Sequence, residues 1–282
     1  MAIMETEART RVANSPRMRH LRAPRFKAGP DEEIRFNKGL RFGQGLVETF
    51  LGTKSDLRVL GSENLYVLRK VLENGEKNPG QRKKVIVTLN HESHLDLPKL
   101  VEAMAFGGGD DLRRKLFIFL GDRLTGSLLV DLGSRQYPWI RTPQPYDEKM
   151  DGKLTEAQLD QKQAEDHALI RDARSAMNYL FSHDRFGVLV PTGTRKAGHD
   201  GIPAVTGYLK GTSILPVHIS GTNEILPPGE WRAHKGTVTV RFGEMYSFSE
   251  IEQSCQELPR DQQRKAQIDM VMGRIYALAP TV

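Results

Sequence analysis

Short apolar runs alternate with amphipathic helical patterns along most of this chain, and this alternation limits the possible folds more than any other feature. Helical periodicity is found near residues 63–74, 97–105, 164–182 and 262–278. Between these segments, runs rich in β-branched and large apolar residues predict strands at 57–60, 85–89, 116–120, 139–141, 187–190, 214–217 and 237–242. Strands that alternate with helices favour parallel pairing, because a parallel connection needs a long crossover. The sequence therefore predicts an α/β fold, with a mostly parallel twisted sheet covered by helices and an N-terminal helical appendage.

The N-terminal residues lie outside this alternation. Residues 1–30 hold seven Arg or Lys and two Glu, which places a charge of +5 there out of a formal +6 for the 282 residues. With three prolines and few large apolar residues, this stretch predicts a basic disordered arm. Residues 31–55 predict an amphipathic helical segment, which packs on the core or lies on a membrane surface. We expect residues 56–282 to form one domain, with a polar surface insertion at 142–166.

Composition excludes several classes of protein. No apolar run approaches the ~20 residues that a spanning helix needs, and no apolar core follows the N-terminal arginines, so we expect neither a membrane span nor a secretory signal. Cys255 is the single cysteine, which excludes an intramolecular disulfide and a multi-cysteine metal site. Its acidic neighbours oppose thiolate formation. The chain has no zinc-finger spacing and no aromatic-rich basic motif, so we expect no nucleic-acid partner.

The most informative stretch is the polar segment that follows the strand predicted at 85–89. It reads Asn90-His91-Glu92-Ser93-His94-Leu95-Asp96 and leads into a predicted helix. Open α/β sheets place their sites at the carboxyl ends of strands. Four residues separate His91 from Asp96, so a turn can bring the carboxylate onto the imidazole and leave the second ring nitrogen as a base. Two structural interpretations stay open: Asp96 as a helix cap, and His91 as a hydrogen-bonded loop residue.

His94 adds a third interpretation of the same segment. His91, His94 and Asp96 together provide three groups that can bind a divalent metal. Zinc proteases place two histidines on one face of a helix, and the spacing of His91, His94 and Asp96 differs from that arrangement. No cysteine is near. A metal-dependent hydrolase therefore remains an alternative function.

A second polar cluster follows the strand predicted at 187–190. It reads Pro191-Thr192-Gly193-Thr194-Arg195-Lys196. Backbone N–H groups in such a turn can hold an anion, and an arginine matches phosphate oxygens with two parallel donors. A solvated surface turn has the same sequence pattern. Arg141, at the end of the strand predicted at 139–141, is either a third basic element or the partner of an acidic side chain.

In this order, the segments resemble the blocks of the glycerophospholipid acyltransferase family, which contains the glycerol-3-phosphate and 1-acylglycerol-3-phosphate acyltransferases. Residues 90–96 match the family's Asn-His-x4-Asp block, and residues 121–123, Gly-Asp-Arg, are similar to a run of the plastid-type enzymes. Residues 139–141 resemble the second block, 191–195 the third, and 214–217 the apolar fourth. Thr192 departs from the glutamate that most relatives carry in the third block, although plastid-type enzymes also have a small hydroxyl residue there.

The resemblance implies that residues 56–282 are an acyltransferase domain. A glycerol hydroxyl would attack the thioester of acyl-CoA or acyl-carrier protein, in phospholipid biosynthesis, with glycerol 3-phosphate or lysophosphatidate as acceptor. His91 would be the general base and Asp96 its orienting partner. The substrate-binding residues would be Arg195, Lys196, Arg141, Gly193, Thr194 and Arg123.

The resemblance implies no metal or other cofactor, because the acyl thioester is a co-substrate. The expected partners are the acyl donor, including acyl-carrier protein, the phosphorylated acceptor and an anionic membrane surface. The expected location is cytoplasmic with peripheral membrane association. A non-catalytic lipid-binding protein that uses the same pocket is a further alternative to the enzyme.

Overall fold

A computed structural model describes residues 56–93, 95–121, 137–143, 154–192, 205–227 and 234–280. The arm predicted at 1–30 and the helical segment predicted at 31–55 lie outside these residues, so the domain boundaries at 30 and 55 stay predictions. The described residues fall into two compact units. The larger runs to residue 116 and resumes at 181, and the smaller spans 117–180.

The larger unit is built on a mixed sheet in which parallel pairs outnumber antiparallel ones. Its strand order is β1-β7-β6-β2-β5, with the short β8 paired to β6. The pairs β1–β7, β2–β6 and β2–β5 are parallel, whereas β6–β7 and β6–β8 are antiparallel. The bounds are β1 Asp56–Leu60, β2 Val85–Leu89, β5 Phe186–Leu189, β6 Ser213–Ser220, β7 Thr237–Phe242 and β8 Tyr246–Ser247.

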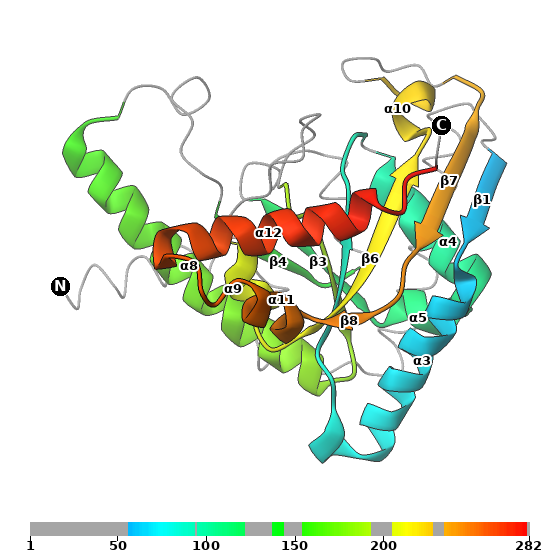
Figure 1. Ribbon diagram of the computed structural model, residues 1–282, viewed down its shortest axis with the longest axis horizontal. Coiled ribbons are helices and arrows are strands. Elements are labelled where there is room, and N and C mark those ends of the chain that lie inside the picture. Colours follow the sequence, from blue (N-terminus) through cyan, green and yellow to red (C-terminus); the bar gives the residue numbers. More distant parts are fainter. Residues whose placement is uncertain are drawn as a thin grey trace. The chain divides into compact units, whose positions relative to one another are not determined.

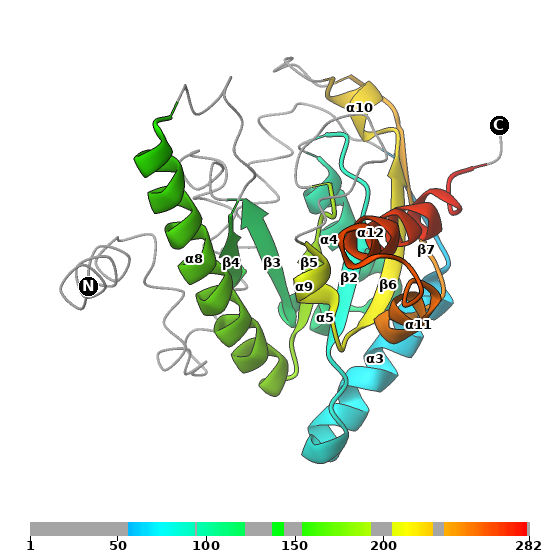
Figure 2. The same cartoon turned by 60° about the vertical axis from the view of Figure 1, so that its left-hand side comes forward.

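Helices of the larger unit form two groups that pack on different strands. In the first group α3 packs on α4, and both contact β7; α5 packs on α4. In the second, α12 contacts α9, α11 and β6. Figure 1 shows α12 crossing in front of β6 while α4 lies behind the strands, and the turned view in Figure 2 agrees. The bounds are α3 Ser62–Lys77, α4 Asp96–Gly108, α5 Asp110–Arg114, α9 Thr206–Leu209, α10 Thr222–Ile225, α11 Phe248–Ser254 and α12 Arg260–Tyr276, with a 3-10 turn at Pro79–Gln81.

In the smaller unit, the described residues form two strands and most of one long helix. β3 (Leu116–Gly121) pairs in parallel with β4 (Trp139–Thr142), so that Leu120 lies opposite Arg141. The helix, α8, spans Glu156–Ser182. Together with the larger unit, this confirms the predicted α/β class with a mostly parallel sheet.

The surface insertion predicted at 142–166 is wrong for its last part, because α8 already begins at Glu156. Thr155 sits just before the helix, and its hydroxyl accepts a hydrogen bond from the backbone N–H of Gln158 at 3.4 Å. Polar pairs four residues apart then support the first turns, namely Gln161–Glu165 and Lys162–Asp166. The polar composition, which indicated an insertion, is therefore equally compatible with the first turns of a helix that faces solvent.

β1 is joined to α3 by a turn that only glycine can form. Gly61 has a φ of 70°, and a Cβ atom there would lie 2.0 Å from the carbonyl oxygen of Phe242 on β7. Asn64 donates its side-chain amide to the same oxygen at 3.1 Å. The Gly-Ser-Glu-Asn run of the sequence thus attaches the start of α3 to β7.

The polar residues around Cys255 in the sequence indicate polar surroundings, but the structure buries this side chain. The side chain is buried at the end of α11, with its Sγ 3.7 Å from Met270 Sδ of α12. Burial raises the pKa of the Cys255 thiol. The predicted opposition to thiolate therefore holds, with desolvation as its cause.

Among the helices that the structure describes, none combines the length and the apolar character needed to span a membrane.

Candidate active site

The carboxyl ends of three parallel strands of the larger unit meet at one edge of the sheet. β2 lies between β5 and β6, with Thr88 opposite both Leu189 and Pro216. The residues that follow β2, β5 and β6 are therefore brought to the same edge. This is the usual place for sites in open α/β sheets.

The predicted contact between His91 and Asp96 is present at this edge. His91 Nδ1 lies 2.9 Å from Asp96 Oδ2. The Asp96 side chain is fully buried, whereas that of His91 is 19% exposed. One member of the pair is thus held inside the protein, and the other reaches solvent.

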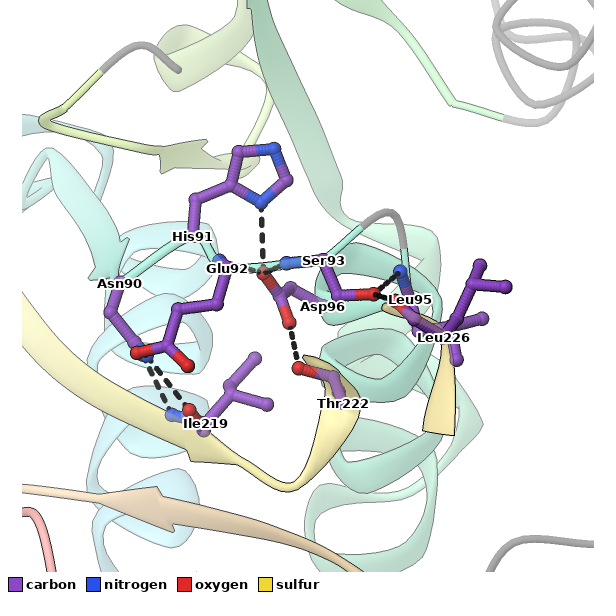
Figure 3. A network of polar contacts seen from close by, with 9 residues as sticks. All are labelled: Asn90, His91, Glu92, Ser93, Leu95, Asp96, Ile219, Thr222 and Leu226. Carbon is purple, nitrogen blue, oxygen red and sulfur yellow. Dashed lines mark hydrogen bonds and ion pairs between the residues drawn. The ribbon is translucent and has the colours of Figure 1, made fainter. Parts of the chain in front are cut away.

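The Asp96 carboxylate is turned back toward the loop that precedes α4. Its Oδ2 accepts the backbone N–H groups of Glu92 at 2.7 Å and Ser93 at 2.9 Å, in addition to His91. Its Oδ1 accepts the hydroxyl of Thr222, from the first residue of α10 (Figure 3). Asp96 is the first residue of α4, and no side chain caps that helix. The interpretation of Asp96 as a helix cap is therefore wrong.

This arrangement fixes the chemical form of the His91 ring. An ionised carboxylate only accepts hydrogen bonds, so Nδ1 has to carry the proton that lies between the two side chains. In the neutral ring Nε2 is then a lone-pair base. Figure 3 shows this second nitrogen pointing away from Asp96 and from the rest of the network. The pair can therefore take a proton from a hydroxyl placed at Nε2.

Asn90 joins the start of this loop to β6. Its side-chain amide donates to the carbonyl of Ile219 at 2.8 Å, and its Oδ1 accepts the N–H of Ile219 at 2.7 Å. The fully buried side chain thus continues the β2–β6 pairing one residue beyond the end of β2. The position of His91 relative to β6 is fixed by these two bonds.

Sequence reasoning missed three residues of this network: Asn90 as a link to β6, Ser93 and Thr222. Ser93 is buried and donates its hydroxyl to the carbonyl of Leu226 at 3.2 Å. One available signal was the Ser-Gly-Thr run at 220–222. It follows a buried strand, as residues 90–96 do, but the predicted strand ended too early, at residue 217.

The phosphate-binding residues predicted from the second cluster are not brought to His91 by any described contact. β5 ends at Leu189, and Pro191 and Thr192 are buried beyond it. Gly193, Thr194, Arg195, Lys196 and Arg123 lie outside the described residues. Arg141 is in the smaller unit, on β4. Their binding roles stay predictions.

The metal interpretation depends on Asp96 being available as a ligand. Both of its oxygens are already occupied by donors from the protein, as given above. No three His, Cys, Asp or Glu side chains gather into a metal-binding group within the described part of the chain. His94, the other expected ligand, lies outside that part.

A second histidine lies on β6, next to the site. His218 is buried, stands opposite Arg241 in the β6–β7 register, and meets the ring of Tyr276 edge-on at 5.8 Å. Burial lowers the pKa of His218, Arg241 lowers it further, and Asp96 acts in the opposite direction. Burial also raises the pKa of Tyr276, and Glu92 adds to this shift. His218 is therefore held in its neutral form.

The fold and the pair define a class of protein: an α/β protein with a His–Asp pair at the carboxyl edge of its parallel strands. No protein-family model matches the chain, and no curated protein matches it significantly. Among solved structures, the chain is similar to the 1-acyl-sn-glycerophosphate (LPA) acyltransferase PlsC from Thermotoga maritima. The match has 18% identity and a TM-score of 0.46, over 91% of this chain and 86% of that chain.

Proposed function

We propose that this protein is an acyltransferase of phospholipid biosynthesis. It moves a fatty acyl group from acyl-CoA or acyl-carrier protein to a hydroxyl of glycerol 3-phosphate or lysophosphatidate. The single observation that carries the proposal is the His91–Asp96 contact of 2.9 Å, with the carboxylate buried and the imidazole open to solvent. The order of the sequence blocks along the chain supports acyl transfer over the other reactions that a His–Asp pair can catalyse.

The proposed step uses His91 as the base. The acceptor O–H donates to Nε2, the oxygen forms a bond to the thioester carbonyl carbon, and Nε2 takes the proton. When the tetrahedral intermediate collapses, the C–S bond breaks and the imidazolium gives its proton to the departing sulfur. Asp96 stays ionised and stabilises the imidazolium between these two transfers.

The phosphorylated acceptor needs cations beside this base. Arg195, Lys196 and Arg141 are the proposed phosphate-binding residues, with Gly193, Thr194 and Arg123 as further contacts. The proposal for residues 193–196 is supported by Thr192, which is three residues beyond the end of the β5 ladder with β2. Thr192 therefore follows β5 at the edge where His91 follows β2.

Peripheral association with an anionic membrane is part of the proposal. It is supported by the charge of the first 30 residues, and by the insolubility of a long-chain acyl product. A metal-dependent hydrolase is less well supported, since Asp96 Oδ2 already accepts three donors of the protein and Oδ1 accepts the Thr222 hydroxyl. No observation of the structure favours a non-catalytic lipid-binding protein.

The test is a panel that pairs acyl-CoA and acyl-carrier-protein donors with glycerol 3-phosphate and lysophosphatidate acceptors. We expect acyl transfer with at least one pair, and a loss of ~10²–10⁴-fold in His91→Ala, which removes the base. The thermal midpoint of the variant serves as the control for folding. Thioester hydrolysis without transfer, in every pair, contradicts the proposal.

A further inference from the structure

The short helix α10 is attached at both ends to the loop that carries the His–Asp pair. At its start, the hydroxyl of Thr222 donates to Asp96 Oδ1. Just beyond its end, the carbonyl of Leu226 accepts the hydroxyl of Ser93 at 3.2 Å. Figure 3 shows both links, and the one from Thr222 reaches Asp96 from the side opposite His91.

The turn that precedes Thr222 leaves little freedom for the backbone there. Gly221 before it has a φ of 86°, and a Cβ atom there would lie 2.2 Å from the carbonyl oxygen of Thr237. The turn is therefore closed against β7 and needs glycine. Thr222 itself is fully buried, so that water does not compete for its hydrogen bond to Asp96.

We propose that Thr222 is a positioning residue for His91 that acts through Asp96, and this inference rests on the acyl transfer proposed above. Two backbone N–H groups hold Oδ2, but a carboxylate fixed at one oxygen can still rotate its plane. Thr222 holds the second oxygen and so fixes that plane. A lone pair of Oδ2 is thereby kept pointing at His91 Nδ1, so the ring keeps its proton on that nitrogen.

The test compares three variants of nearly equal size. Thr222→Val removes the hydroxyl and keeps the shape of the side chain, whereas Thr222→Ser keeps the hydroxyl and removes the methyl group. Thr212→Val is the matched control. Thr212 is also buried and donates its hydroxyl to a backbone carbonyl, that of Leu209 at 2.7 Å, but it lies just before the opposite end of β6.

A positioning role predicts a particular kinetic pattern. In Thr222→Val we expect kcat to fall ~10–100-fold, the value of one hydrogen bond to a charged group, while KM for both substrates stays within about twofold. Thr222→Ser should recover most of kcat, and Thr212→Val should leave it unchanged. In an Asp96→Ala background, Thr222→Val should lower kcat no further, because the side chain through which Thr222 acts is absent.

A second measurement does not depend on acyl transfer. Nitrogen-15 NMR of the imidazole, assigned with His91→Ala, reports which ring nitrogen of His91 carries the proton at about pH 8. We expect the wild type and Thr212→Val to show Nδ1–H, and Thr222→Val to show a mixture of the two tautomers. If only this spectrum changes and no substrate pair is turned over, the proposed function fails and the positioning role stands. An unchanged tautomer in Thr222→Val, or an unchanged kcat in an active enzyme, overturns the inference.

Discussion

Replacing Asp96 with asparagine removes the charge of the buried partner of His91 and keeps the shape of the side chain. Oδ2 accepts three N–H groups, from Glu92, Ser93 and His91, at 2.7–2.9 Å. An amide NH₂ cannot accept a hydrogen bond, so the amide oxygen of the variant has to occupy the Oδ2 position. The NH₂ then faces Thr222, whose hydroxyl can rotate to accept. The variant should therefore keep the proton of His91 on Nδ1.

The magnitude follows from the change of charged contacts into neutral ones. A hydrogen bond to a charged group contributes about 1.5–3 kcal/mol and a neutral one about 0.5–1.5, a difference of roughly 1–1.5 kcal/mol per contact. Three contacts give a loss of about 3–4.5 kcal/mol in the free energy of unfolding. For activity, the imidazolium loses its counter-charge but the base remains. We expect kcat to fall ~10²-fold, which is less than in His91→Ala, where the base itself is lost.

Steady-state thioester turnover and urea unfolding of wild type, Asp96→Asn and His91→Ala measure both quantities. Two results would contradict these roles of Asp96. If Asp96→Asn is as inactive as His91→Ala while folded, the amide has turned over and the assignment of Oδ2 as the acceptor of three donors is wrong. If its kcat stays within twofold of wild type, Asp96 does not orient the base.

Three further predictions concern the cations, the second histidine and the arm. Arg195→Ala should raise KM for the phosphorylated acceptor ~10–100-fold and spare KM for the donor, with Arg195→Lys restoring only part; equal damage to both contradicts the assigned role. Burial and Arg241 lower the folded-state pKa of His218, so protonation favours the unfolded chain, and stability falls as pH drops below about 6.5. His218→Gln should lose less unfolding free energy than wild type between pH 7.5 and 5 in urea titrations, and equal losses count against the mechanism. Deleting residues 1–30 should weaken co-sedimentation with anionic vesicles at low salt, since each Lys or Arg near such a surface contributes ~1 kcal/mol; identical sedimentation of both proteins refutes a role for the arm.

Much of the larger unit could be predicted from local patterns. The strands at 85–89 and 237–242 coincide with β2 and β7. β2 is buried at every position, and β7 alternates between buried apolar side chains and more exposed ones, so both show patterns that are typical of strands. The short α11 was not predicted, although Ser247 and Glu250 form a capping box at its start. Cys255 illustrates the opposite case. A polar sequence surrounds it, but the packing of α11 on α12 buries its side chain.

For the candidate site, the His91–Asp96 contact could be predicted from the local sequence, since four intervening residues form one turn and a few backbone dihedrals decide the distance. The contacts that hold this pair depend on residues far away along the chain. Thr222 is 126 residues from Asp96 along the chain, and Ile219 is 129 from Asn90. Both contacts exist because β6 lies next to β2, and an apolar strand pattern does not encode which strand is its neighbour. That choice is made when the whole sheet forms, because burial of all its faces selects the strand order.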